Sequence, residues 1–237
     1  MPKDIFPGFP PEALRFLRQL KRNNNRDWFL QNKTVYETKV KAPMIDLLSK
    51  LQPEIRKFAP EISYDPVKSI FRIYRDIRFS SDKSPYKTNI AASLSPSDRR
   101  GQHFAGLYLH LDPDEFMVAG GLYHPEKDAL MAVRQHVASE YTKLRSIIQS
   151  QLFKKFFGKM EGDQLSRVPR GFSANHPAGD LLRHKDFLAY SGFEAKFAES
   201  PDLQKAILER FHAMMPLLRF LNNALQKMPR SQQNFLP

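Results

Sequence analysis

The hydrophobic period of this sequence changes twice, and these changes constrain the fold more than any other feature. Apolar residues first recur at steps of three and four. From about Ser69 to His124 they alternate, and from about Lys127 the longer period returns. A period of 3.6 is typical of an amphipathic helix, and a period of 2 is typical of a half-buried strand. Helices on both sides of a central sheet indicate an α+β fold.

The first third of the chain predicts helices separated by polar breaks. One helix begins near Pro11 and ends at the asparagine run Asn23–Asn25, because short amides favour caps over helix interiors. A second helix begins at Arg26 and runs through Val40. Pro43 either kinks this helix or begins a further one.

The central third predicts an antiparallel sheet of about four strands, covered by helices from both ends of the chain. Turn-forming residues at Pro96–Gly101 and Asp112–Asp114 separate the last strands, and Gly120–Gly121 indicates a bulge or a close backbone approach. The predicted strands are Ile70–Phe79, Asn89–Leu94, Ala105–Leu111 and Glu115–Tyr123.

The last third is again helical. A long helix is predicted from Lys127 to about Leu152, followed by a loop at Ser166–Gly179 and a helix near Asp180–Tyr190. The final helix covers Leu203–Leu225 and is expected to kink at its proline, Pro216. No repeat, low-complexity segment or convincing linker interrupts the chain, so residues 1–237 are expected to form a single domain.

Composition limits the class of protein. Hydrophobic residues make up 41% of the chain, which is typical of a globular protein. No apolar run approaches 18 residues, so no membrane partner is expected. The start lacks the residue order of a signal peptide, and the absence of cysteine rules out disulfides and thiol catalysis. We therefore expect a cytoplasmic protein, with its oligomeric state left open.

The chain is basic, with a formal net charge of +12 from 37 basic and 25 acidic residues. Basic helices of this kind can bind nucleic acid through phosphate contacts, so a nucleic-acid partner is possible. Solvated charged faces explain the same excess without a partner, because no block of five or six like charges forms a tail.

The segment 70–89 is the strongest functional candidate because it combines cations, hydroxyls and a turn. It predicts a strand and loop that bind a phosphate- or carboxylate-bearing small molecule. Arginine offers a planar fork for two oxygens, lysine offers a point charge, and tyrosine and threonine add hydroxyl donors. The candidate ligand-binding residues are Arg72, Arg75, Asp76, Arg78, Lys83, Tyr86, Lys87 and Thr88.

Other interpretations of the same segment stay open. Arg75 falls in the apolar register of the predicted strand and needs a partner there, so Arg75, Asp76 and Asp82 can instead form an internal salt-bridge network. Asp76 or Asp82 can also serve as the base of an enzyme acting on a phosphorylated or nucleic-acid substrate. A nucleic-acid or protein-binding module using the basic helical surfaces is the third alternative. The sequence identifies no catalytic residue and no cofactor.

The histidines give little sign of a metal site. None of the seven occurs as HxH, HExxH or HxxxH, and no carboxylate pair is seen beside them at metal-binding spacing. His110, two residues after Tyr108, is interpreted as an ordinary sheet residue. No metal is therefore expected.

Four blocks of the sequence occur together in one order. They are Arg22–Val40, Ile70–Ala92, Val118–Pro125 and Arg167–Phe187. The chain resembles, over nearly its whole length, a widespread family catalogued as domain of unknown function 2461. The resemblance implies one cytosolic domain and carries no catalytic residues and no assigned activity.

Overall fold

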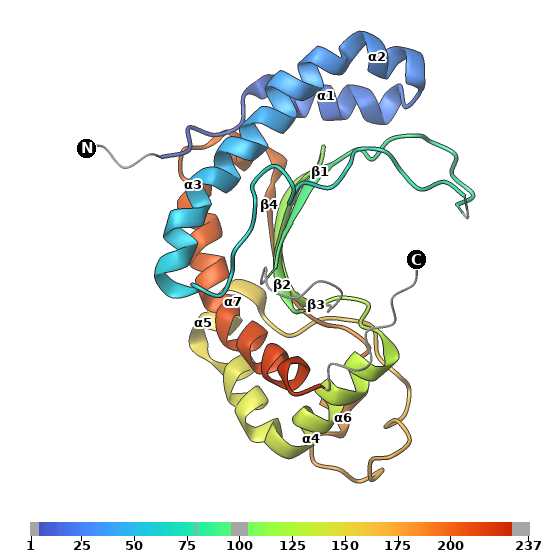
Figure 1. Cartoon of the computed structure of the whole chain (residues 1–237), viewed down its shortest axis with the longest axis vertical. Coiled ribbons are helices and arrows are strands. Elements are labelled where there is room, and N and C mark those ends of the chain that lie inside the picture. The colour runs from blue at the N-terminus through green and yellow to red at the C-terminus, as the bar shows by residue number, and fades with distance from the viewer. Residues whose placement is uncertain (1–4, 79, 96–103, 229–237) are drawn as a thin grey trace. The chain divides into compact units, whose positions relative to one another are not determined.

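The computed structural model describes residues 5–78, 80–95 and 104–228 (Figure 1). The chain begins with α1 (Pro11–Arg22), α2 (Arg26–Val35), the π-helical turn η1 (Tyr36–Lys41) and α3 (Ala42–Phe58). The strands β1 (Ile90–Leu94), β2 (Gly106–Leu111) and β3 (Glu115–Leu122) follow. The remaining elements are α4 (Lys127–Gln149), α5 (Gln151–Phe157), α6 (Gly179–Leu182), β4 (Phe187–Glu194), the 3₁₀ turn η2 (Ala195–Glu199) and α7 (Leu203–Gln226).

The α+β architecture predicted from the sequence is confirmed. The four strands form one antiparallel sheet in the order β1-β2-β3-β4, and helices precede and follow it along the chain. Residues along β2 and β3 alternate between buried and half-buried positions. One face of these strands is therefore core, and the other carries half-exposed side chains.

The chain divides into two compact units, each continuous in space but not in sequence. The first comprises Met1–Leu94, Tyr108–Val118 and Gly192–Glu209. The second comprises Ser95–Leu107, Ala119–Ser191 and Arg210–Pro237. The boundaries between the two units fall inside three strands and inside α7. That residues 1–237 form a single domain, as expected from the sequence, stays a prediction.

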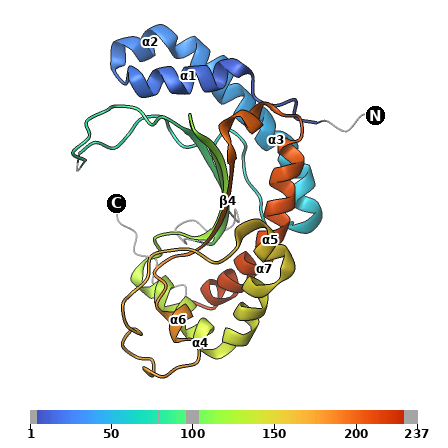
Figure 2. The same ribbon diagram turned by 180° about the vertical axis from the view of Figure 1, so that it is seen from behind.

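In the first unit, α1 and the start of α2 lie where the sequence predicts, but α2 ends at Val35 and continues as η1, whereas the helix was predicted to run through Val40. Asn25 caps α2 by accepting a hydrogen bond from the Trp28 backbone N–H at 3.0 Å, which satisfies one of the unpaired donors of the first turn. Pro43 is the second residue of α3, which follows η1 without a break in the helical backbone, so the chain passes through the proline as one continuous helical segment. Figures 1 and 2 show α1, α2 and α3 of this unit from opposite sides.

In the second unit, α7 packs directly on β3. Gly120 permits this contact: a Cβ added there would lie 2.7 Å from the sulfur of Met214 and 3.4 Å from a methyl group of Leu218. A buried amide, Asn222, accepts from the Ala105 N–H at 2.9 Å and donates to the Ala105 carbonyl at 3.0 Å. No helix in the described part of the chain is long and apolar enough to span a membrane.

Two of the predicted elements are wrong. Ile70–Phe79 is not a regular strand: Ile70 and Tyr74 form only isolated antiparallel bridges, to Ala92 and Tyr86, and Phe79 lies outside the described residues. The predicted turn Pro96–Gly101 also lies outside them.

The helix predicted near Asp180–Tyr190 is the second error, since α6 ends at Leu182 and β4 begins at Phe187. Backbone bonds to a distant segment cause the change. Lys185 N–H donates to the Asp163 carbonyl at 2.7 Å, and Glu161 and Leu188 exchange both backbone bonds at 2.8 and 3.0 Å. These partners replace the local helical ones, so the chain extends.

A buried tyrosine makes the first unit sensitive to alkali. Burial raises the pKa of Tyr36, which exposes only 5% of its surface, to about 12. Its contribution to stability is therefore complete below pH 10 and is lost as the pH rises toward 12. We expect the unfolding free energy of the wild type to fall by roughly 1 kcal/mol more than that of Tyr36→Phe between pH 9 and 11. Urea unfolding at both pH values tests this. Tyr123→Phe, a substitution of an exposed tyrosine, is the control: its unfolding free energy should fall between pH 9 and 11 by as much as that of the wild type.

Candidate functional site

Residues 70–89 are here called the basic arm. Residues 70–78 and 80–89, its described part, form an irregular ribbon that extends from β1 (Figure 1). Its first half bonds to β1 at the base and to its second half further out. Phe71 N–H donates to the Ala91 carbonyl at 2.9 Å, and Lys87 N–H donates to the Ile73 carbonyl at 2.7 Å. Further out, Arg75 N–H donates to Pro85. Since Pro85 has no N–H to return, the pairing ends there and the tip of the arm is a loop.

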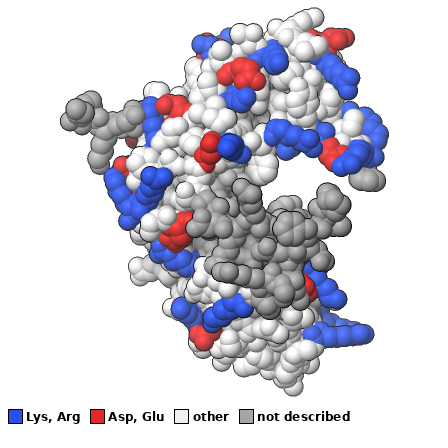
Figure 3. Space-filling model, in the orientation of Figure 1, with Lys and Arg blue, Asp and Glu red and all other residues white. Residues whose placement is uncertain are grey.

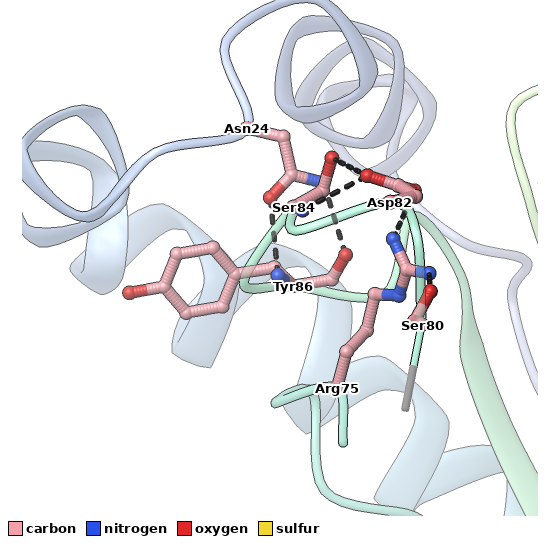
Figure 4. Close-up of polar contacts among 6 residues, drawn as sticks. All are labelled: Asn24, Arg75, Ser80, Asp82, Ser84 and Tyr86. Atoms are coloured by element: carbon pink, nitrogen blue, oxygen red, sulfur yellow. Dashed lines mark hydrogen bonds and ion pairs between the residues drawn. The ribbon is translucent and has the colours of Figure 1, made fainter. Parts of the chain in front are cut away.

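Polar contacts among the arm's own residues hold its tip (Figure 4). The Arg75 guanidinium pairs with Asp82 and reaches the Ser80 hydroxyl at 3.4 Å. Asp82 also accepts from the hydroxyl of Ser84 at 2.6 Å and from its backbone N–H at 2.9 Å. These bonds from Ser84, with the pairing to Arg75, lower the pKa of Asp82 well below its usual range. Arg75 therefore finds its partner within the loop.

The other two cations at the tip are bound in the same way. Arg78 makes a forked contact with Asp76, through Nε at 3.0 Å and Nη2 at 2.7 Å, and this lowers the pKa of Asp76 to about 2. Lys83 donates to the Ile77 carbonyl at 3.0 Å. Three predicted ligand-binding cations thus have partners inside the arm.

The α1–α2 turn holds the arm in place through two hydrogen bonds to the Tyr86 backbone. The Asn24 side chain accepts from the Tyr86 N–H at 3.0 Å and donates to the Tyr86 carbonyl at 2.9 Å, in the manner of a neighbouring strand (Figure 4). The Tyr86 ring stacks on Phe29 of α2 at a centroid separation of 4.2 Å. Because Tyr86 exposes only 3% of its surface, its role here is to anchor the arm.

The base of the arm holds the two remaining cations. Lys87 is half-buried and lies over the Phe71 ring, with Nζ 5.2 Å from the centroid. Burial, and next the nearby charge of Arg72, lower the pKa of Lys87. Arg72 is exposed, and its charge helps to lower the pKa of Asp76. Within residues 5–78, 80–95 and 104–228, neither Arg72 nor Lys87 forms an ion pair with a carboxylate at 4 Å or less. Thr88, next along the chain, is half-buried.

The half-exposed face of β2 lies next to Phe71 at the base of the arm. The Phe71 ring lies 6.3 Å from that of Tyr108, and the Tyr108 hydroxyl lies 3.0 Å from Nδ1 of His110. Beyond His110, the β2–β3 turn brings two carboxylates close to the imidazole. Asp112 and Glu115 place carboxylate oxygens 3.8 and 3.7 Å from its Nε2. Aromatic, cationic and acidic groups therefore follow one another along this face.

The sequence interpretation missed the two carboxylates. It found none at metal-binding spacing, yet Asp112 and Glu115 lie two and five residues after His110. The signal was the pattern His-x-Asp-x-x-Glu across a strand and its turn, because a hairpin turn can fold the last position back beside the first. Burial lowers the pKa of His110, and the two carboxylates oppose that shift.

An open cavity of about 600 Å³ lies elsewhere in the first unit, against the proline-rich N-terminal segment. Its lining is mainly apolar and includes Phe6, Phe9, Pro43 and Glu199. None of the eight predicted ligand-binding residues lines it, so it gives no support to the predicted site.

Comparison with known proteins places the chain in a family. No curated protein matches the chain. The family of conserved hypothetical proteins DUF2461 matches residues 12–220, which include all but the first residue of α1, the basic arm, all four strands and most of α7. The match covers far more than half of the chain, and the protein therefore belongs to the DUF2461 family.

Proposed function

We propose that the protein binds a phosphate- or carboxylate-bearing ligand at the base of the basic arm, with Arg72 and Lys87 as the residues that contact the anion. The observation that carries the proposal is the uneven distribution of partners among the arm's five cations. Arg75, Arg78 and Lys83 are bound by groups of the arm itself. Arg72 and Lys87 form no ion pair with a carboxylate among the residues that the structure describes.

The electrostatics of this pair favour an anion. Two like charges close together repel, and partial burial adds a desolvation cost for Lys87, as the lowered pKa of Lys87 reflects. An anion between them would relieve both effects. Arginine would supply a forked contact and lysine a point charge. The ring of Phe71, which is 45% exposed, lies below the lysine and offers apolar surface to the carbon skeleton of a ligand.

The remaining predicted residues take supporting roles in this proposal. Tyr86 and Asn24 fix the arm against α2, and the ion pairs of the tip keep the loop folded. Asp76 and Asp82 are poor general bases near neutral pH, because their neighbours lower the pKa of both carboxyls. We therefore include no catalytic step. A cytoplasmic location stays a prediction.

Nucleic-acid binding by the helical surfaces has less support. On the face shown in Figure 3, lysine and arginine side chains are spread over the surface and in several places lie beside acidic ones. A mixed distribution of this kind gives weaker phosphate attraction than a continuous basic stripe.

The test is a titration of anions against matched charge variants. A panel of inorganic phosphate, citrate, sugar phosphates and nucleotides is first screened by thermal shift, and the strongest binder is then measured by calorimetry. We expect Arg72→Gln/Lys87→Gln to weaken that binding at least tenfold, since hydrogen bonds to charged groups contribute about 1.5–3 kcal/mol each. Arg78→Gln, which removes an equally exposed but paired arginine of the arm, should change it less than threefold. Equal losses in both variants, or no loss in the double variant, would overturn the proposal.

A further inference from the structure

We propose that His110, Asp112 and Glu115 form a binding site for one divalent transition-metal ion, such as Mn²⁺ or Zn²⁺. The inference is independent of the proposed anion site, because different residues and a different observation carry it. One nitrogen and two carboxylate oxygens from these residues all lie within 4.8 Å of one another.

The imidazole Nε2 is the central observation. This atom is buried and has no hydrogen-bond partner among the described residues, although the histidine side chain as a whole exposes 12% of its surface. The two carboxylate oxygens that face it lie 3.8 and 3.7 Å away, too far for a hydrogen bond. An unpaired buried nitrogen that faces two acidic groups is the arrangement that a shared cation would satisfy.

The distances between the three donor atoms would suit a metal ion once the donors move closer together. Donor atoms about 2.1 Å from one ion, at tetrahedral or octahedral angles, lie about 3.0–3.4 Å apart. The two distances to Nε2 are about 0.3–0.8 Å longer than this, and all three donor atoms lie within 4.8 Å of one another. Rotation of the Glu115 side chain, which is 40% exposed, can bring its oxygen closer to both partners, and the His110–Asp112 distance must shorten separately. The same exposure gives an ion access from solvent.

Two of the three donors, His110 and Asp112, are held by a second contact that leaves the metal-facing atom available. The Tyr108 hydroxyl lies 3.0 Å from Nδ1 of His110, which orients the ring so that Nε2 points toward the carboxylates. Metal-bound histidines usually have such a partner on the other nitrogen. In Asp112, Oδ1 accepts the backbone N–H groups of Asp114 and Glu115 at 2.7 and 2.8 Å, and Oδ2 faces the histidine.

A glycine on the neighbouring strand makes room for the third donor. A Cβ added at Gly192 of β4 would lie 2.9 Å from Oε2 of Glu115, so any larger residue would displace this carboxylate. The nearby lysine does not neutralise the site. Lys21 forms its ion pair with Asp114, at 2.8 Å, and interacts with Asp112 only through the weaker, longer-range attraction of the two charges.

The donor set indicates the class of metal. Imidazole favours zinc, iron, nickel and copper, whereas carboxylates also suit manganese and magnesium. One histidine with two carboxylates therefore favours a first-row transition ion over Ca²⁺ or Mg²⁺. Three protein donors leave coordination positions for water or for a ligand, as in catalytic rather than purely structural zinc sites.

The test is direct binding of Mn²⁺ to the full chain after treatment with a chelator. Electron paramagnetic resonance of free Mn²⁺ gives affinity and stoichiometry, and calorimetry with Zn²⁺ repeats the measurement. We expect one ion per chain. His110→Ala and Glu115→Gln should each weaken binding at least tenfold, and Asp114→Asn, which removes a carboxylate of the same turn, should weaken it less than threefold.

Gly192→Ala separates metal binding from folding. The atom that it displaces is the flexible end of a side chain, so the melting temperature of the metal-free protein should change little. Its metal affinity should nevertheless fall about tenfold. The proposal is overturned if the wild type binds neither Mn²⁺ nor Zn²⁺ at 1:1 stoichiometry, or if His110→Ala, Glu115→Gln and Gly192→Ala all retain wild-type affinity.

Discussion

Phe29→Ala is expected to lower the free energy of unfolding by about 3–5 kcal/mol, the range for removing a large aromatic ring from a packed core. Phe29 exposes 2% of its surface and contacts four aromatic rings. One of them belongs to Tyr86, stacked at 4.2 Å, which anchors the basic arm to α2. The substitution should therefore leave a cavity and also loosen the arm that carries the proposed anion site.

Urea unfolding measures the loss, and hydrogen exchange of the arm's backbone amides reports its loosening. Leu30→Ala is the matched control, because Leu30 is the next residue of the same helix and is 66% exposed. Its effect should stay within about 0.5 kcal/mol. A loss below about 1 kcal/mol in Phe29→Ala would show that the aromatic cluster does not hold the arm as described.

Gly121→Ala is expected to destabilise the protein by about 3–5 kcal/mol through a clash and backbone strain together. Gly121 lies in β3 with φ +133°, a conformation that L side chains rarely adopt. An added Cβ would lie 2.0 Å from the carbonyl oxygen of Phe187 in β4. Because that oxygen belongs to the backbone of the paired strand, the clash cannot be relieved by a side-chain rotation.

Gly158→Ala provides the control for strain alone. Gly158 follows α5 with φ +69°, and an added Cβ would meet no atom within 4 Å. We expect a loss of about 1–3 kcal/mol, the cost of this γ-turn conformation (φ +69°, ψ −64°) for a residue with a side chain. Thermal unfolding of both variants makes the comparison, and equal losses would contradict the role of the close contact between the strands.

The close approach at Gly121 also shows what the sequence could predict. The glycine pair was interpreted as a bulge or a close backbone contact, and a close contact is present. Three of the predicted strands match β1, β2 and β3 within one residue at each end, because alternation over a short segment is a local signal. The helices α1, α4 and α7 were predictable for the same reason.

The fourth strand could not be predicted from local pattern. Residues 180–190 have apolar spacing compatible with a helix, but Lys185 and Leu188 donate to carbonyls more than 20 residues earlier in the chain. Pairing over such a distance overrides local preference. The basic arm failed as a strand for a related reason. Its tip side chains, Asp76 and Asp82, bond to nearby backbone and arginine groups and hold a loop instead.

The candidate site was partly predictable. The sequence identified a concentration of cations, and it left open whether they form a salt-bridge network or bind an anion. In the structure, the tip of the arm contains the salt-bridge network. At the base, Arg72 and Lys87 form no ion pair with a carboxylate among the described residues, and anion binding there is our proposal. The acidic neighbours of His110 were missed because they lie across a turn.

The most direct test of the central claim, that Arg72 and Lys87 bind an anion, is the crystal structure of the protein soaked in tungstate. Tungstate is a tetrahedral oxyanion with a strong anomalous signal. We predict an anomalous peak within ion-pair distance of both side chains, and its loss in crystals of Arg72→Gln/Lys87→Gln. The absence of a peak at the base of the arm, in a lattice that leaves it open to solvent, would contradict the account. Tungstate bound only at the tip, beside Arg75 or Lys83, would contradict it equally.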